Sequence, residues 1–119
     1  GPEARRALNP GLIDVSLSAY GRSGPWGDRR GFDSLVQMSC GIAAEGMRQA
    51  GLDRPLPLPV QALDHGTGYL MAATALRGLA RRAGGQTTRA ELSLARTTLL
   101  TCTVTDSWPI RAKGSLVRA

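Results

Sequence analysis

The sequence is poor in the features that mark several functional classes. Aromatic side chains make up only 4% of its 119 residues, so the core is expected to be aliphatic and rich in alanine. Its two cysteines, Cys40 and Cys102, have no cluster of Cys and His residues around them, which argues against a zinc site and leaves a disulfide open. No apolar run approaches the length of a membrane span, and the first residues form no apolar signal segment. We therefore expect a cytoplasmic protein with no metal site and no membrane span.

What the sequence does have is positive charge and glycine. The formal net charge is +6, and arginine far outnumbers lysine. A basic surface suits phosphate-bearing partners such as coenzymes, nucleotides, nucleic acid or anionic lipid, without choosing among them. The arginines form no long run and no aromatics are interleaved with them, so no nucleic-acid partner is predicted. The length suffices for one small domain with a modest core.

Apolar spacing predicts helices and strands that alternate along the chain. An α/β layer arrangement with few strands, flanking helices and a partly parallel sheet follows from this order. Residues 46–59 are expected to form a turn-rich connector, and residues 101–105 have β character. The predicted helices are 2–8, 32–44, 67–82 and one beginning at 93–100, and the predicted strands are 12–18 and 87–92.

One acidic residue stands out in the centre of the chain. Asp64 lies within residues 56–69, where two prolines precede it and two glycines follow it. It comes just before the predicted helix 67–82, whose backbone N–H groups would favour a negative charge. The pattern leaves two interpretations open, a carboxylate presented to a cleft or a local cap or turn residue. The predicted apolar face of this helix comprises Tyr69, Ala72, Ala73, Leu76, Leu79, Ala80 and Ala83, and the opposite face Thr74, Arg77, Gly78 and Arg81.

Residues 19–31 form the second notable stretch, with four glycines and three arginines. Glycine lets a backbone approach a ligand closely, and the guanidinium group can donate two parallel hydrogen bonds to a phosphate. This pattern is typical of a phosphate-binding loop and equally of an ordinary surface loop.

Several segments, in this order and at these separations, resemble the class III CoA-transferase family (the CaiB/BaiF family). This family includes formyl-CoA and carnitine CoA-transferases and α-methylacyl-CoA racemases. The resemblance is strongest over residues 9–100 and leaves 101–119 as a divergent tail. The segments are NPGLIDVS (9–16), YG (20–21), GPW (24–26), DR (28–29), GFD (31–33) with Gln37, PVQALD (59–64) with Gly66 and Gly68, RAGGQ (82–86) and AELSL (90–94).

The resemblance implies a fold and a chemistry. The chain would be a single, partial Rossmann-like layer of the CoA-transferase large domain, and the full-length family forms a homodimer. Asp64 falls on the family's nucleophilic aspartate, which attacks the thioester of an acyl-CoA and passes CoA to a carboxylic acid through an aspartyl covalent intermediate. No permanently bound cofactor is implied, because coenzyme A enters as a thioester substrate.

The resemblance also suggests which residues contact coenzyme A. Arg30 is the best match for a cation facing a phosphate, and Arg22 and Arg29 are weaker ones. In the same region, Tyr20, Gly21, Phe32 and Asp33 match positions near the coenzyme or the reacting centre. The alternative for Phe32 is simple core packing, and for the arginines a solvated surface position.

Two alternatives to the transferase remain open. In the racemases of the family a histidine occupies the position of Phe32 and works opposite the aspartate, so its absence here favours transfer over racemisation. The other alternative is a catalytically inactive fragment that binds coenzyme A, because members of this family are several-fold longer than this chain.

Overall fold

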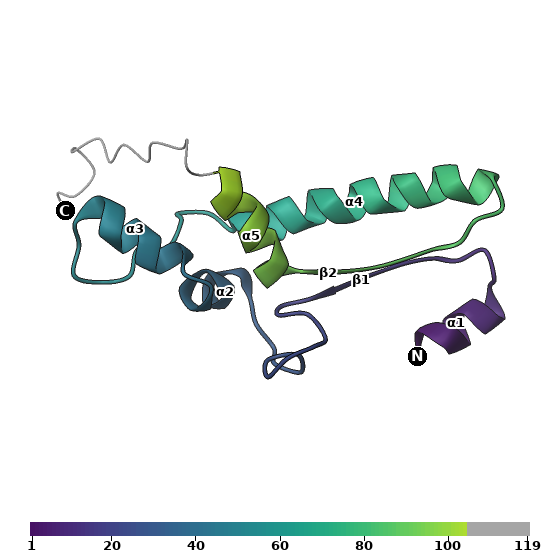
Figure 1. Cartoon of the computed structure of the whole chain (residues 1–119), viewed down its shortest axis with the longest axis horizontal. Coiled ribbons are helices and arrows are strands. Elements are labelled where there is room, and N and C mark those ends of the chain that lie inside the picture. The colour runs from purple at the N-terminus through teal and green to yellow at the C-terminus, as the bar shows by residue number, and fades with distance from the viewer. Residues whose placement is uncertain (105–119) are drawn as a thin grey trace.

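The computed structural model of the chain describes the backbone of residues 1–104 and the side chains of residues 1–100 (Figure 1). Helices and strands alternate, so the predicted α/β class is confirmed. In order, the elements are α1 (Pro2–Leu8), β1 (Ile13–Ser18), α2 (Asp33–Ser39), α3 (Ile42–Ala50), α4 (Ala62–Ala83), β2 (Thr88–Ser93) and α5 (Leu94–Val104).

The two strands form a parallel pair although about seventy residues separate them in sequence. Ile13 pairs with Thr88, and the register continues to Ser18 opposite Ser93. Because side chains alternate between the faces of a strand, Ile13 and Thr88 face α4 while Asp14 and Arg89 lie on the opposite face. In Figure 1, α4 runs along the length of the strand pair.

A glycine allows α4 to lie directly on the strands. Gly78 is buried, and a Cβ atom added there would lie 2.7 Å from Cγ2 of Ile13 and 3.3 Å from Cβ of Thr88. A side chain at this position would therefore push the helix away from the sheet or displace Ile13. Gly78 was predicted on the outer face of the helix, and the structure places it at the centre of the contact.

The predicted orientation of α4 is wrong as a whole. Its buried residues are Leu63, Thr67 and Gly78, whereas Tyr69 and Leu76 on the predicted apolar face are 78% and 67% exposed. The helix also starts at Ala62, five residues before its predicted beginning. Apolar spacing predicts the wrong face because the strands meet the helix at Gly78, where an added side chain would collide with Ile13.

The buried core lies where the carboxyl ends of the strands meet α2, α4 and α5. It contains Ala19, Val36, Leu63 and Leu94. Two residues of this cluster come directly after the strands: Ala19 follows β1, and Leu94, the first residue of α5, follows β2. The sheet is thus tied at one end to the helices that carry the candidate site.

Three further local predictions need correction. Residues 32–44 form two helices, α2 and α3, because Gly41 adopts a left-handed conformation with φ of 90° between them. The turn-rich connector is shorter than predicted, since α3 extends to Ala50. Residues 101–104, expected to have β character, continue α5, and residues 105–119 lie outside the described part of the chain.

Within the part of the chain that the structure describes, no helix combines the length and apolar character needed to cross a membrane. The same residues contain no group of three or more His, Cys, Asp or Glu side chains arranged to hold a metal ion.

The packing of α4 can be tested with two glycines of the same helix. Gly78→Ala should lower the free energy of unfolding by about 1–3 kcal/mol, the usual cost of overpacking a tight contact. Gly68→Ala should raise it by about 0.5–1 kcal/mol, because a Cβ there meets nothing within 4 Å and alanine favours the helix. Urea unfolding followed by far-ultraviolet circular dichroism measures both, and equal effects would contradict the packing described here.

Candidate functional site

A buried carboxylate from α2 holds the first turn of α4. Asp33, the first residue of α2, is only 1% exposed. Its Oδ2 accepts a hydrogen bond from the backbone N–H of Asp64 at 2.8 Å, and its Oδ1 accepts one from Nε2 of Gln37. The first N–H groups of a helix have no partner within the helix, so Asp33 caps α4 from a neighbouring helix.

Gln37 extends this contact to the chain that leads into α4. It lies one turn after Asp33 on the same face of α2 and is 2% exposed. Its Nε2 also donates to the carbonyl of Val60 at 3.0 Å, and its Oε1 accepts from the N–H of Leu58 at 2.8 Å. The polar atoms of this buried amide are therefore satisfied, as a buried polar group requires.

The same connector is fastened to α3 as well. The N–H of Leu56 donates to the carbonyl of Ala43 at 2.9 Å. A Cβ at Gly46 would collide with the carbonyl oxygen of Leu56, so only glycine permits this approach. Helices α2 and α3 together therefore set the path by which the chain enters α4.

Asp64 itself is the third residue of α4, and its side chain is exposed. The Asp64 side chain does not cap the helix. No side-chain cap hydrogen bond is formed at the N-terminus of α4, and the Asp64 N–H donates instead to Asp33. Among residues 1–100, the Asp64 carboxylate has no hydrogen bond or ion pair. The interpretation of Asp64 as a mere cap is thus wrong, and its carboxylate is open to solvent.

The glycine- and arginine-rich loop, residues 19–31, is held by its aromatic side chains. The rings of Tyr20 and Trp26 meet edge to face with centroids 4.9 Å apart, and the guanidinium of Arg29 lies 4.8 Å from the centre of the Trp26 ring. The hydroxyl of Tyr20 is 3.0 Å from that of Ser39 in α2, so either can donate the hydrogen bond. These contacts attach the loop to the helix that carries Asp33.

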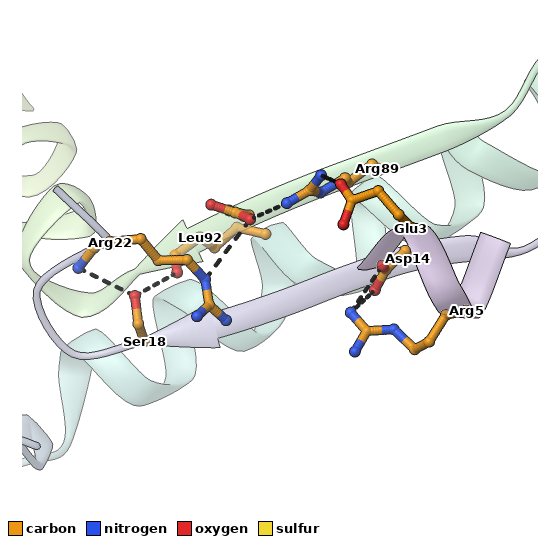
Figure 2. A network of polar contacts seen from close by, with 9 residues as sticks. Glu3, Arg5, Asp14, Ser18, Arg22, Arg89 and Leu92 are labelled. Carbon is orange, nitrogen blue, oxygen red and sulfur yellow. Dashed lines mark hydrogen bonds and ion pairs between the residues drawn. The ribbon is translucent and has the colours of Figure 1, made fainter. Parts of the chain in front are cut away.

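A line of charged side chains runs along the sheet face that points away from α4 (Figure 2). Arg22 approaches Glu91 at 3.7 Å, and Glu91 also accepts a hydrogen bond from Arg89 at 2.8 Å, which raises the pKa of Arg89. Arg89 reaches Glu3 of α1 at 3.3 Å. The loop and α1 are thus linked through the outer face of the strands.

Some of the predicted coenzyme-contact residues already have partners within the chain, and Arg30 differs from them. Arg22 pairs with Glu91, and the N–H of Gly21 donates to the Ser18 hydroxyl at 3.1 Å. Arg30 is exposed and pairs with no acid among residues 1–100.

Phe32 and Asp33 differ from each other although they are adjacent. Phe32 is 75% exposed, so the interpretation as core packing is wrong. Asp33 is buried with both oxygens occupied, which leaves it no free oxygen for a coenzyme. Sequence reasoning gave no role to Gln37, although a polar pair four residues apart at a helix start was a usable signal.

Two cavities among the described residues are lined neither by Asp64 nor by the loop 19–31. The larger, about 350 Å³, lies beside the end of β2 and the start of α5 against Leu70, Ser93 and Arg96. The smaller, about 40 Å³, lies between α1 and the strands. The expectation that Asp64 stands at the mouth of a cleft lined by the loop therefore finds no support in these cavities.

Comparison with known sequences identifies the family. The sequence model of CoA-transferase family III matches residues 1–116. The chain belongs to CoA-transferase family III. A probable fatty acyl-CoA transferase of Mycobacterium tuberculosis, Rv3272, is 35% identical over 82 residues, which cover 69% of this chain and 20% of the relative. The succinyl-CoA–D-citramalate CoA-transferase of Chloroflexus aurantiacus is 46% identical over 44 residues, 37% of this chain and 11% of that enzyme.

Solved structures agree with this assignment. A crystal structure of Rv3272 superposes with a TM-score of 0.72 and 28% identity, covering 87% of this chain and 30% of that one. A CaiB/BaiF family protein from Brucella suis has the same fold, with a TM-score of 0.62, 23% identity, and 90% and 30% of the two chains covered. This CoA-transferase family III chain therefore spans about a third or less of these relatives.

The contact between Asp33 and α4 can be tested by its effect on stability. Asp33→Ala leaves the Asp64 N–H and the Gln37 amide without their buried acceptor, which should lower the free energy of unfolding by about 1–3 kcal/mol. Asp53→Ala is the matched control, because Asp53 is exposed and such surface changes are usually within about 0.5 kcal/mol of neutral. Denaturant unfolding measures both, and an unchanged midpoint for Asp33→Ala would show that the contact contributes nothing.

Proposed function

We propose that the protein carrying this chain moves CoA between an acyl-CoA thioester and a carboxylic acid, with Asp64 as the nucleophile. The observation that carries the proposal is the exposed carboxylate of Asp64, which has no partner among residues 1–100, on a helix turn whose backbone is held by buried hydrogen bonds. Family membership supports CoA transfer as the general chemistry. Two relatives are named as CoA-transferases acting on fatty acyl or succinyl groups, and one solved structure is a variant of Rv3272 with an aspartate replaced by alanine.

The proposed reaction proceeds in covalent steps at one carboxylate. Asp64 attacks the thioester carbonyl, the C–S bond breaks, and an acyl–aspartyl anhydride and CoA thiolate result. The thiolate then attacks the aspartyl carbonyl, which releases the donor carboxylate and leaves an aspartyl-CoA thioester. The acceptor carboxylate attacks this thioester, which expels CoA thiolate and forms a second anhydride between Asp64 and the acceptor. The thiolate then attacks the acceptor's carbonyl, which gives the new acyl-CoA and frees the Asp64 carboxylate. Each intermediate is an activated acyl group, so no step has to create a thioester from unactivated acid.

The basic loop supplies the proposed contact with the coenzyme. Arg30 is the best candidate for the CoA phosphates, because it is exposed and has no acidic partner among residues 1–100. Tyr20, Gly21 and Arg22 belong to the same loop, where an arginine fork and open backbone suit an anion. Phe32, which follows the loop in sequence, has an exposed ring. CoA is a substrate here, and no permanently bound cofactor is proposed.

The homodimer implied by the family resemblance and the cytoplasmic location expected from the sequence form part of the same proposal. The acyl-CoA and the acceptor acid are the proposed small-molecule partners, with no nucleic acid among them.

Substitution of Asp64 tests the function directly. In the full protein, Asp64→Asn keeps the side-chain volume but removes the nucleophile, so transfer from acetyl-, succinyl- or palmitoyl-CoA to free acids should fall by at least about 1,000-fold. CoA binding, followed by calorimetry, should be unchanged. Asp53→Asn serves as the control for loss of an exposed acid. Transfer at the wild-type rate in Asp64→Asn would reject the mechanism, and exchange of the α-proton with solvent deuterium without CoA transfer would favour a racemase instead.

A further inference from the structure

We propose that Asp33 and Gln37 are positioning residues for the reaction, and that they fix where the Asp64 carboxylate stands. The inference rests on the proposed function of Asp64. The pair, called the Asp33–Gln37 clamp below, touches neither substrate nor the reacting atoms and acts only through the backbone of residues 58–64.

The clamp reaches the nucleophile through that residue's own peptide group. Oδ2 of Asp33 accepts from the N–H of Asp64 at 2.8 Å, so the bond ends one atom away from the Asp64 Cα. Any shift of α2 relative to α4 therefore moves the atom from which the Asp64 side chain projects. A bond to a residue further along α4 would lack this direct effect.

Gln37 also fixes the segment that leads into α4, residues 58–61. Gln37 holds the carbonyl of Val60 and the N–H of Leu58, and its amide also donates to Oδ1 of Asp33. Both clamp side chains are at least 98% buried, so water does not compete for these bonds. Prolines at 57 and 59 restrict the same segment further. The side chain of Asp64 is exposed and has no partner among residues 1–100, while its backbone N–H is held by Asp33.

Such an arrangement suits a carboxylate nucleophile. The side chain has to reach a thioester carbonyl within reacting distance, and a misplacement of about 1 Å can cost about 100-fold in rate. The clamp also occupies the Asp64 N–H, so this amide cannot serve as a donor to the developing oxyanion. Asp33 is thereby reassigned from coenzyme contact to support of the nucleophile.

A kinetic comparison separates positioning from mere stability. In the full protein, Asp33→Ala should lower kcat by about 10–100-fold while KM for the acyl-CoA changes less than about threefold, because ground-state binding is left intact. Asp33→Asn should recover part of kcat, since its side-chain oxygen can still accept from the Asp64 N–H while its amide nitrogen cannot accept from Nε2 of Gln37. Asp53→Ala, which removes an exposed acid outside the clamp, is the control and should leave kcat within about twofold.

Amide hydrogen exchange gives a readout that needs no activity. The N–H of the third residue of a helix normally exchanges fast, and the clamp predicts that the Asp64 N–H is protected in the wild-type protein. Asp33→Ala should remove this protection while Asp53→Ala preserves it.

The outcomes distinguish this inference from the proposed function. If Asp64→Asn abolishes transfer but Asp33→Ala leaves kcat unchanged, the positioning role is rejected and the nucleophile stands. If the Asp64 N–H exchanges freely in the wild-type protein, the clamp is rejected, whether or not Asp64→Asn abolishes transfer. If Asp33→Ala does not fold, Gln37→Leu gives the test, because it removes the bonds to Val60 and Leu58. A kcat equal to wild type in Gln37→Leu would then overturn the proposal.

Discussion

The structure depends on one hydrogen bond between two helices, in which the buried carboxylate of Asp33 accepts the N–H of Asp64. It satisfies a helix-end donor that has no partner of its own and brings a negative charge to the positive end of α4. Because Asp33 is also the first residue of α2, the same side chain joins the starts of two helices. Gln37 ties this junction to the connector, so burial and hydrogen bonding support each other there.

The other elements of the described chain are placed around this junction. α4 leaves the junction and lies on the strand pair through Gly78, while Val36 and Leu63 pack beside the junction in the core at the strand ends. The loop after β1 is attached to α2 through Tyr20 and to β2 through Arg22. In open α/β folds, ligands bind beyond the carboxyl ends of the strands, and the basic loop begins at that edge.

The sequence predicted much of the fold because alternation and helical spacing are local properties. β1, β2, α1 and the strand-to-helix step at Ser93 were predicted within one or two residues. The face of α4 was not, because it is decided by what lies against the helix: the strands meet it at Gly78, and Thr97 of α5 meets it at Thr67. Asp64 was singled out by its setting and by family resemblance. The role of Asp33 as its cap was missed, because that contact joins residues 31 positions apart and leaves no local pattern.

The central claim is that Asp64 becomes covalently attached to CoA, and mass spectrometry tests it most directly. The full protein is incubated with an acyl-CoA that it turns over, without acceptor acid, and the digested peptides are searched for a CoA thioester or, after hydroxylamine, a hydroxamate. The account predicts the modification on the peptide that contains Asp64, and on Asp64 itself. Transfer accompanied by no adduct at Asp64, or by an adduct on another residue, would contradict it.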